Sequence, residues 1–166
     1  VILVPMGDGQ SLGLRLIDYD GMFVPSLADT AVGEAGHPNF QHPQRTRDGG
    51  YNIDSDRFSH LVVCCAIRAL AAGGRRLWDQ YDNGDNLLFR EQDFVSPATS
   101  PLFQELWKTS DAEVRNFTGH LLLAAVKPLD EVPALETVFA DGAVQALSAD
   151  QTKQVNTLLR RGAAHV

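Results

Sequence analysis

The sequence predicts one mainly α-helical domain with a small β-hairpin at its N-terminus. Three observations support this prediction. Two short apolar runs open the chain, Val1 to Val4 and Leu12 to Ile17, on either side of a Gly7-Asp8-Gly9 turn, which is typical of a hairpin. A long apolar stretch follows Asp56. Three further apolar segments downstream each begin at a serine of the kind that caps helices.

The composition and net charge of the chain argue against some classes of function. Of the 166 residues, 14 are Lys or Arg and 21 are Asp or Glu, which gives a formal net charge of −7 and a pI of about 5.1. Nucleic-acid-binding surfaces concentrate Lys and Arg, so this balance argues against a nucleic-acid partner. With 44% apolar and 21% charged residues, the chain has the composition of a globular protein of about one domain. A chain of this length buries enough surface to fold without a metal or disulfide.

The cysteines and the apolar stretches predict a cytoplasmic protein. Cys64 and Cys65 are sequence neighbours and form no disulfide framework, which favours a reducing compartment. The longest strongly apolar stretch, Leu61 to Ala72, contains Arg68 and is about half a membrane span, so no membrane partner is expected. Val1 to Pro5 has no basic flank and no cleavage pattern, unlike a signal peptide.

The stretch after Asp56 is predicted to form the central helix. Apolar residues from Phe58 to Leu70 cover nearly every face of a helix, so we expect this helix to be buried on all sides. Asp54, Ser55 or Asp56 is positioned to cap its start, and Gly73-Gly74 is expected to stop it.

The remaining helices are predicted from their caps. Ser100-Pro101 opens a helix from Leu102 to Lys108, because proline is favoured at the first helical position. Capping boxes at Ser110-x-x-Glu113 and Ser148-x-x-Gln151 open two more. The first of these is expected to run through Val126, and residues 78–84 and 128–142 have the composition of a polar turn and a linker.

A long region without periodicity, residues 18–50, separates the hairpin from the helices. It is rich in Asp, Gly, Pro, His and Gln, and structureless loops longer than about 15 residues are usually functional or disordered. The organisation expected is therefore a hairpin (1–17), this loop (18–50), a helical part (54–127) and a helical C-terminal extension (128–166).

Three segments in and after this region form an ordered set. Leu14-Arg-Leu-Ile-Asp18-Tyr19-Asp20-Gly21 places an acidic residue at the end of an apolar strand. Gly36-His-Pro-Asn-Phe40-Gln-His-Pro43-Gln44 follows, and Asp56-Arg-Phe-Ser59 opens the apolar helix. In their order and spacing, these segments resemble the C-terminal lobe of the eukaryotic-type serine/threonine protein kinase superfamily, over about residues 1 to 127.

The resemblance implies that Asp18 holds Mg²⁺ on the phosphates of ATP, because a strand of the kinase lobe ends in an Asp-Phe-Gly motif whose carboxylate does this. Tyr19 would be the aromatic residue that packs beneath Asp18. Asp20 stands where kinases have glycine, and a second carboxylate there either assists metal binding or repels the nucleotide. The alternative for Asp18 is a turn residue that ends the strand.

The second and third segments are matched residue by residue. Gly36, Phe40, Pro43 and Gln44 align with the kinase pattern Gly-Thr-x-x-Tyr-x-Ala-Pro-Glu, and Asp56 with the residue that opens the central helix. His37 replaces the threonine and Gln44 replaces the glutamate. Arg115 stands where kinases have the arginine that pairs with this glutamate, and Gln44 could still accept a hydrogen bond from it without the charge-assisted pairing.

The nucleotide-binding half of a kinase has no match in these residues. The glycine-rich loop, the strand lysine, the helix glutamate and the His-Arg-Asp catalytic loop are missing, and the resemblance assigns them upstream of Val1. No catalytic residue is therefore expected within this chain, which alone should be inactive; Mg²⁺ and ATP are expected only for the intact protein.

Three functions remain open at this point. The first is ATP-dependent phosphotransfer to serine or threonine of a protein substrate. The second is a pseudokinase or protein-interaction module that binds a partner domain, with self-association through the surface that would face the missing lobe. The third is a small-molecule kinase of the same superfamily, which the acidic Asp20 favours.

Overall fold

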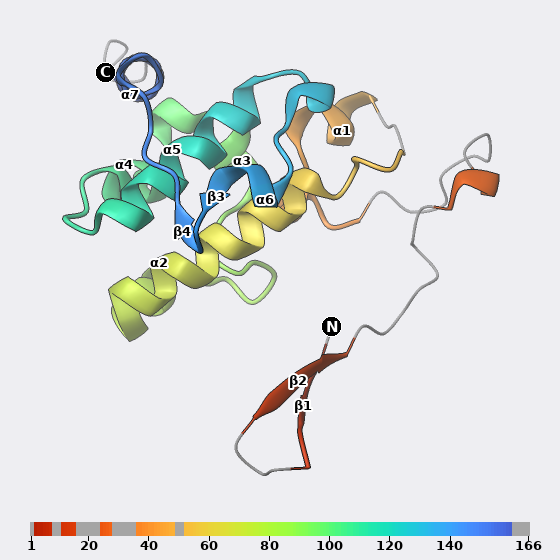
Figure 1. Cartoon of the computed structure of the whole chain (residues 1–166). Helices are drawn as coiled ribbons and strands as arrows, with labels where there is room; N and C mark the ends of the chain where they lie inside the picture. Colours follow the sequence, from red (N-terminus) through yellow and green to blue (C-terminus); the bar gives the residue numbers. More distant parts are fainter. Residues whose placement is uncertain (1, 8–10, 16–23, 28–35, 49–51, 161–166) are drawn as a thin grey trace.

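The computed structural model describes residues 2–7, 11–15, 24–27, 36–48 and 52–160, and these are mainly helical (Figure 1). An N-terminal hairpin is formed by β1 (Ile2–Pro5) and β2 (Leu12–Arg15), which pair antiparallel with Leu3 opposite Leu14 and Val4 opposite Gly13. The predicted fold class, mainly α with a small N-terminal hairpin, is thereby confirmed.

The other elements are short except for three helices. In chain order they are η1 (Pro25–Leu27), η2 (Pro38–Phe40), α1 (Pro43–Asp48), α2 (Arg57–Tyr81), α3 (Glu91–Val95), η3 (Pro97–Thr99), α4 (Pro101–Trp107), α5 (Ala112–Val126), η4 (Leu129–Glu131), α6 (Leu135–Val138), β3 (Phe139–Ala140), β4 (Ala143–Val144) and α7 (Ala149–Arg160).

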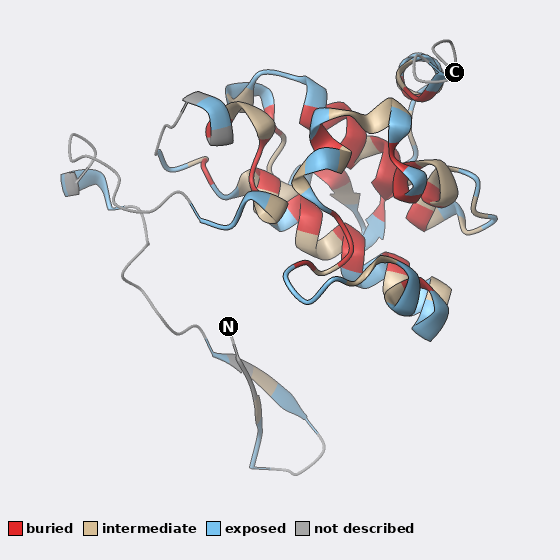
Figure 2. Cartoon of the chain, turned by 180° about the vertical axis from the view of Figure 1, so that it is seen from behind, coloured by how far each residue is buried: buried red, intermediate tan, exposed pale blue. Residues whose placement is uncertain are grey.

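The core lies where α2, α4 and α7 pack around α5, and the buried segments gather there in Figure 2. Its centre is aromatic. The rings of Phe58 and Phe94 meet edge to face with centroids 5.0 Å apart, and Phe89 lies 5.3 Å from Phe103. Such pairs are favoured beyond the apolar area that they bury, so they fix how α3 and α4 sit against the start of α2.

The long helix α2 differs from its prediction in two respects. It is not buried on all sides, because the Ile67 side chain is 56% exposed while Leu61 and Ala66 are fully buried. It also continues past its predicted stop to Tyr81, so residues 78–81 are helical and not a turn. The glycine pair at 73–74, predicted to stop the helix, instead marks a kink within it. Gly74 has φ 64° and ψ −160°, which interrupts the helical backbone.

The most enclosed helix is α5, which contributes nine buried residues, among them Val114, Phe117 and Leu121. Its cap differs from the prediction by one residue: the Asp111 carboxylate, and not Ser110, accepts from the backbone N–H groups of Glu113 and Val114. The serine caps predicted at Ser100 and Ser148 are confirmed, whereas Asp56 at the N-cap of α2 makes no side-chain capping bond. Ser100 Oγ accepts from Phe103 N–H, and Ser148 and Gln151 form a reciprocal capping box.

The chain after Pro128 packs on the same core as the helices before it. Val132 and Val138, within the stretch whose composition resembled a linker, are buried, as are Val155 and Leu159 of α7. β3 and β4 pair antiparallel in a second small hairpin. His120 of α5 meets the carbonyl of Gln145 at 2.9 Å just beyond this hairpin.

By length and composition α2 is a candidate membrane span. Its 25 residues include an 18-residue window of mean hydropathy 1.2, of which 33% is buried in the protein. The sequence-based expectation considered only the 12 or so residues around Cys64 and Cys65, whereas the helix is about twice as long. The buried side of α2 packs on α5.

Candidate functional site

Three neighbouring residues of the first sequence motif are proposed to hold metal and nucleotide. Asp18, Tyr19 and Asp20 lie outside the described residues, so these three assignments stay predictions. Within the described ranges, no three His, Cys, Asp or Glu side chains are grouped as a metal-ligand set. The other predicted residues, Gly36, Phe40, Pro43, Gln44, Asp56 and Arg115, are all described.

The segment from Gly36 to Arg45, here called the docked segment, contacts the start of α2 through a hydrogen bond and a pair of rings. Ser59 Oγ donates a 2.8 Å hydrogen bond to the carbonyl of Phe40. The His42 ring meets the buried Phe58 ring edge to face, with centroids 5.1 Å apart. The sequence-matched segments 36–44 and 56–59 are therefore in direct contact.

Local sequence signals explain the shape of the docked segment. Gly36 has φ 74°, a conformation that favours glycine. His37 then caps the short helix η2 by accepting at Nδ1 from Asn39 N–H, and Pro38 occupies the first helical position. Pro43 opens α1 in the same way.

His42 is the buried polar centre of the docked segment. Its Nδ1 accepts from Gln44 N–H at 3.1 Å, so the neutral ring carries its proton on Nε2, which donates to the Ala124 carbonyl at 3.1 Å. Burial lowers the pKa of His42, and the nearby positive charge of Arg47 lowers it further. Two backbone hydrogen bonds act in the opposite direction, but the pKa remains below its usual value. His42 therefore joins the docked segment to the end of α5 as a neutral side chain.

Arg45 is the buried cation of the site. Its side chain is 5% exposed, and Nη1 donates to Gln41 Oε1 at 2.7 Å and to the Ser55 carbonyl at 3.3 Å. The carboxylate of Asp56, 65% exposed, lies 3.7 Å from the same nitrogen. Asp56 stands at the N-cap of α2 without a side-chain capping bond, so its visible role is to face Arg45.

Gln44 and Arg115 are not brought together as the resemblance implied. Gln44 Oε1 accepts from Leu129 N–H, beyond the C-terminal end of α5. Arg115 lies in the first turn of α5 and donates from Nη1 to the Thr109 carbonyl. The helix between Arg115 and Val126 spans about 16 Å at its usual rise, which separates the two side chains. The arginine that anchors the segment is Arg45, one residue after Gln44, which donates to Gln41 four residues before it in the sequence.

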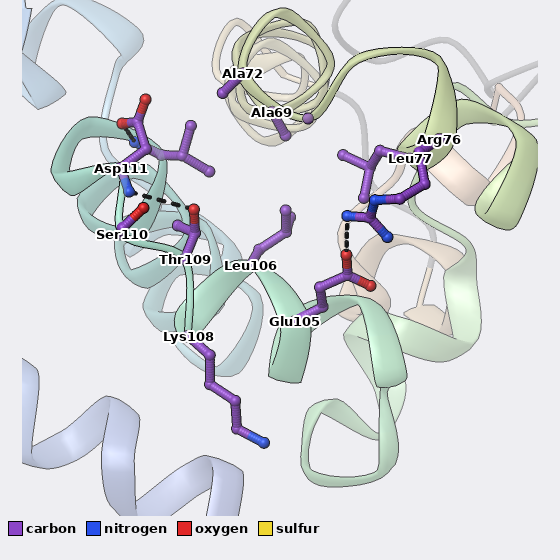
Figure 3. Close-up of a pocket in the computed structure, with 12 residues that line it drawn as sticks. Ala69, Ala72, Arg76, Leu77, Glu105, Leu106, Lys108, Thr109, Ser110 and Asp111 are labelled. Carbon is purple, nitrogen blue, oxygen red and sulfur yellow. Dashed lines mark hydrogen bonds and ion pairs between the residues drawn. The ribbon is translucent and has the colours of Figure 1, made fainter.

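A separate hollow of about 710 Å³ lies between α2, α4 and the start of α5 (Figure 3). Small and apolar side chains, Ala69, Ala72 and Leu106, line its walls, while Arg76 and Glu105 face each other at one end. No sequence motif pointed to this hollow, because its lining comes from three elements and has no shared spacing.

The polar groups at that end satisfy one another. Glu105 accepts from Arg76 Nη2 at 2.5 Å and from Tyr81 Oη at 2.7 Å. Burial opposes ionisation of Glu105, but the hydrogen bonds from Arg76 and Tyr81 outweigh it and lower the pKa of the carboxyl. Burial, with the bond to Glu105 and its charge, raises the pKa of Tyr81 to about 12. A carboxylate and a phenol held in these ionisation states stabilise the α2–α4 contact and are poor acid–base catalysts near pH 7.

The two cysteines also lack the features of a reactive site. Cys65 is fully buried, and desolvation raises its pKa to about 12 despite a hydrogen bond with Thr118; burial likewise raises the pKa of Cys64. Reactive thiols have lowered pKa values in electropositive, partly exposed surroundings. Cys65 therefore acts as a small core residue, and the half-buried Cys64 packs against the core.

No family model, curated protein or solved structure matches the chain. A functional interpretation therefore depends on the order of the sequence motifs and on the contacts of the described residues. Of these contacts, those between the docked segment and the start of α2 involve the largest number of motif residues.

Proposed function

We propose that this chain is the C-terminal, helical lobe of a protein-kinase-like phosphotransferase, which in the intact polypeptide transfers phosphate from Mg-ATP to serine or threonine of a protein substrate. The observation that carries the proposal is the contact between two motifs that residues 45–55 separate in the sequence. The kinase resemblance matches the first motif to the end of the activation loop and the second to the start of the central helix, and these two motifs lie in contact. The hydrogen bond from Ser59 to Phe40 and the packing of His42 on Phe58 support this.

On this proposal, Asp18 supplies a carboxylate for Mg²⁺, since hard cations prefer oxygen ligands and phosphoryl transfer needs a metal on the phosphates. Tyr19 packs beneath it, and Asp20 adds a second carboxylate. The chain's own part in the reaction is to orient the metal and to present the protein substrate.

The docked segment provides a rigid support for that substrate. The buried guanidinium of Arg45 ties Gln41 to the backbone of Ser55 and faces Asp56. His42 fixes the same segment to α5. A segment held at both sides in this way changes little when substrate binds, which reduces the ordering cost of binding.

The phosphate-binding loop, its lysine and the catalytic base have no counterpart in the 166 residues, so the proposal requires the intact polypeptide to supply them. The chain alone is then one wall of a nucleotide site. It should not transfer phosphate by itself.

The test is Mg²⁺-dependent ATP turnover by the intact polypeptide with Asp18→Asn. A neutral amide is a poor ligand for Mg²⁺, so turnover should fall at least a hundredfold while the thermal transition stays unchanged. Asp141→Asn is the matched control, because Asp141 is exposed with φ 51°, a conformation that asparagine adopts readily. Equal turnover by Asp18→Asn and the wild type would contradict the role of Asp18.

A second candidate is a pseudokinase or interaction module, which the exposed face of α2 favours. Ile67 is 56% exposed, with the partly buried Cys64 and Leu70 beside it on the helix, and an apolar face of this kind is typical of a surface that binds a partner. An intact polypeptide that neither binds nor hydrolyses ATP would favour this candidate. The small-molecule kinase, suggested by Asp20, would phosphorylate a small acceptor in preference to a protein.

A further inference from the structure

Two hollows lie at the C-terminal end of α5. The first, of about 340 Å³, lies between α5 and α7, and the second, of about 430 Å³, lies between α1, α3 and α5. Val126, the last residue of α5, lines both. We call the pair the α5-end groove and define it by Leu123, Val126, Lys153 and Leu158 in the first hollow and Phe94 and Val95 in the second.

The groove is apolar and open. Val95 is 54% exposed and Val126 is 46% exposed, although they follow the buried residues Phe94 and Ala125 directly. These two exposed valines come from different helices and line the same groove. Exposed apolar residues are unremarkable singly, but when they gather on a concave surface they indicate a binding site.

The rim of the first hollow is basic, in a protein that is acidic overall. Lys127 and Lys153 border the first hollow, and none of the described residues that line it is acidic. Arg47 and Glu91 border the second. Lys127 also lies 4.0 Å from the exposed Glu131, at the limit of an ion pair. Since the whole chain carries a net charge of −7, a local excess of lysine beside an apolar surface selects for negatively charged partners.

We propose that the α5-end groove binds an acidic peptide segment of a partner protein. Two large apolar side chains of the peptide occupy the two hollows on either side of Val126, and its carboxylates face Lys127 and Lys153. Apolar anchors in a groove with charged residues at its rim are a recurrent mode of peptide recognition. The groove contains none of the residues proposed to hold nucleotide, although Pro43 of the docked segment lines its second hollow.

The experiment is selection of random 12-residue peptides displayed on phage against this chain, followed by fluorescence anisotropy with a synthetic copy of an enriched peptide. The enriched peptides are expected to carry a net negative charge and at least two large apolar residues. Lys153→Glu should weaken binding of the synthetic peptide at least tenfold, and Val126→Glu should do the same. Binding should also weaken as salt is raised, since exposed charges are screened.

Two variants serve as matched controls. Lys108→Glu reverses an exposed lysine at the other hollow, and Ile67→Glu places a charge on the exposed face of α2; both should bind the peptide within twofold of the wild type. Because all four altered side chains are exposed or at a helix end, circular dichroism should show unchanged helix content. The proposal is overturned if no peptide is enriched, if the enriched peptides are uncharged or basic, or if Lys153→Glu binds them as the wild type does. It is equally overturned if the groove variants change only self-association of the chain.

Discussion

His42 and Arg45 are the two buried side chains through which the docked segment holds the helical body. Each meets groups from more than one element: His42 contacts α2 and the carbonyl of Ala124 in α5, and Arg45 contacts Gln41 and Ser55. Polar groups buried in this way must keep their partners, because an unsatisfied one costs about 1–3 kcal/mol. Protonation of the buried His42 therefore couples the stability of the protein to pH.

Acidification should destabilise the protein through His42. The folded state lowers its pKa below 6.5, so below that pH the unfolded state binds more protons and the free energy of unfolding falls as pH falls; above about pH 7 it should be level with respect to this group. A protonated Nδ1 would also lose its hydrogen bond from Gln44 N–H.

Burial lowers the pKa of His120 as well, so the pH dependence of the free energy of unfolding would not distinguish the two histidines. The measurement is therefore an NMR titration in which the imidazole signals of His42 are followed separately. We expect a midpoint below 6.5 and the proton on Nε2 in the neutral form. A midpoint at or above 6.5 would show that His42 is not buried as described.

The exposure of Ile67 reverses what its sequence position suggested. Ile67→Ala should change the free energy of unfolding by less than about 1 kcal/mol, because the side chain is largely in solvent and alanine favours the helix. Leu61→Ala, a fully buried position on the same helix, should cost about 2–5 kcal/mol. Urea denaturation compares the two, and equal losses would contradict the orientation of α2.

Among the elements, helix starts followed their sequence signals more closely than helix faces did. The caps at Ser100 and Ser148 formed as predicted because a capping bond needs only residues three apart. The face of α2 could not be predicted in this way, because its apolar residues surround the helix and only the position of α5 decides which of them are buried. Likewise Gly74 was identified as a break, but the helix resumes because Leu77 returns to the core.

The shifted cap of α5 gives a test at this scale. Asp111→Ala should lower the free energy of unfolding by about 0.5–2 kcal/mol, since its carboxylate accepts two backbone N–H groups and faces the helix N-terminus. Ser110→Ala should change it by less than about 0.5 kcal/mol, because the exposed Ser110 makes no capping bond. Thermal melts of the two variants compare them, and a larger loss for Ser110→Ala would place the cap where the sequence pattern had put it.

For the whole molecule, the sequence predicted the fold class and the order of the motifs along the chain, but neither the contact between segments 36–44 and 56–59 nor the partners of individual motif residues. Gln44 and Arg115 were matched by their order in the chain, and order does not say that α5 holds them at opposite ends. Arg45 was missed because its partners, the Ser55 carbonyl and Asp56, meet it only after the chain folds back. The α5-end groove and the hollow between α2, α4 and α5 could not be predicted from the sequence, because each is lined by residues of several elements.

On the proposed function, this chain forms one wall of a nucleotide site. A single carboxylate that holds Mg²⁺ through its waters contributes little affinity without the opposing lysine and glycine-loop amides. Titration calorimetry of Mg-ATP, with the 166-residue chain and with the intact polypeptide, tests this most directly. We predict a dissociation constant for the chain of about 1 mM or weaker, which is about −4 kcal/mol, and micromolar binding by the intact polypeptide. Micromolar binding by the chain alone, or no binding by the intact polypeptide, would contradict the account.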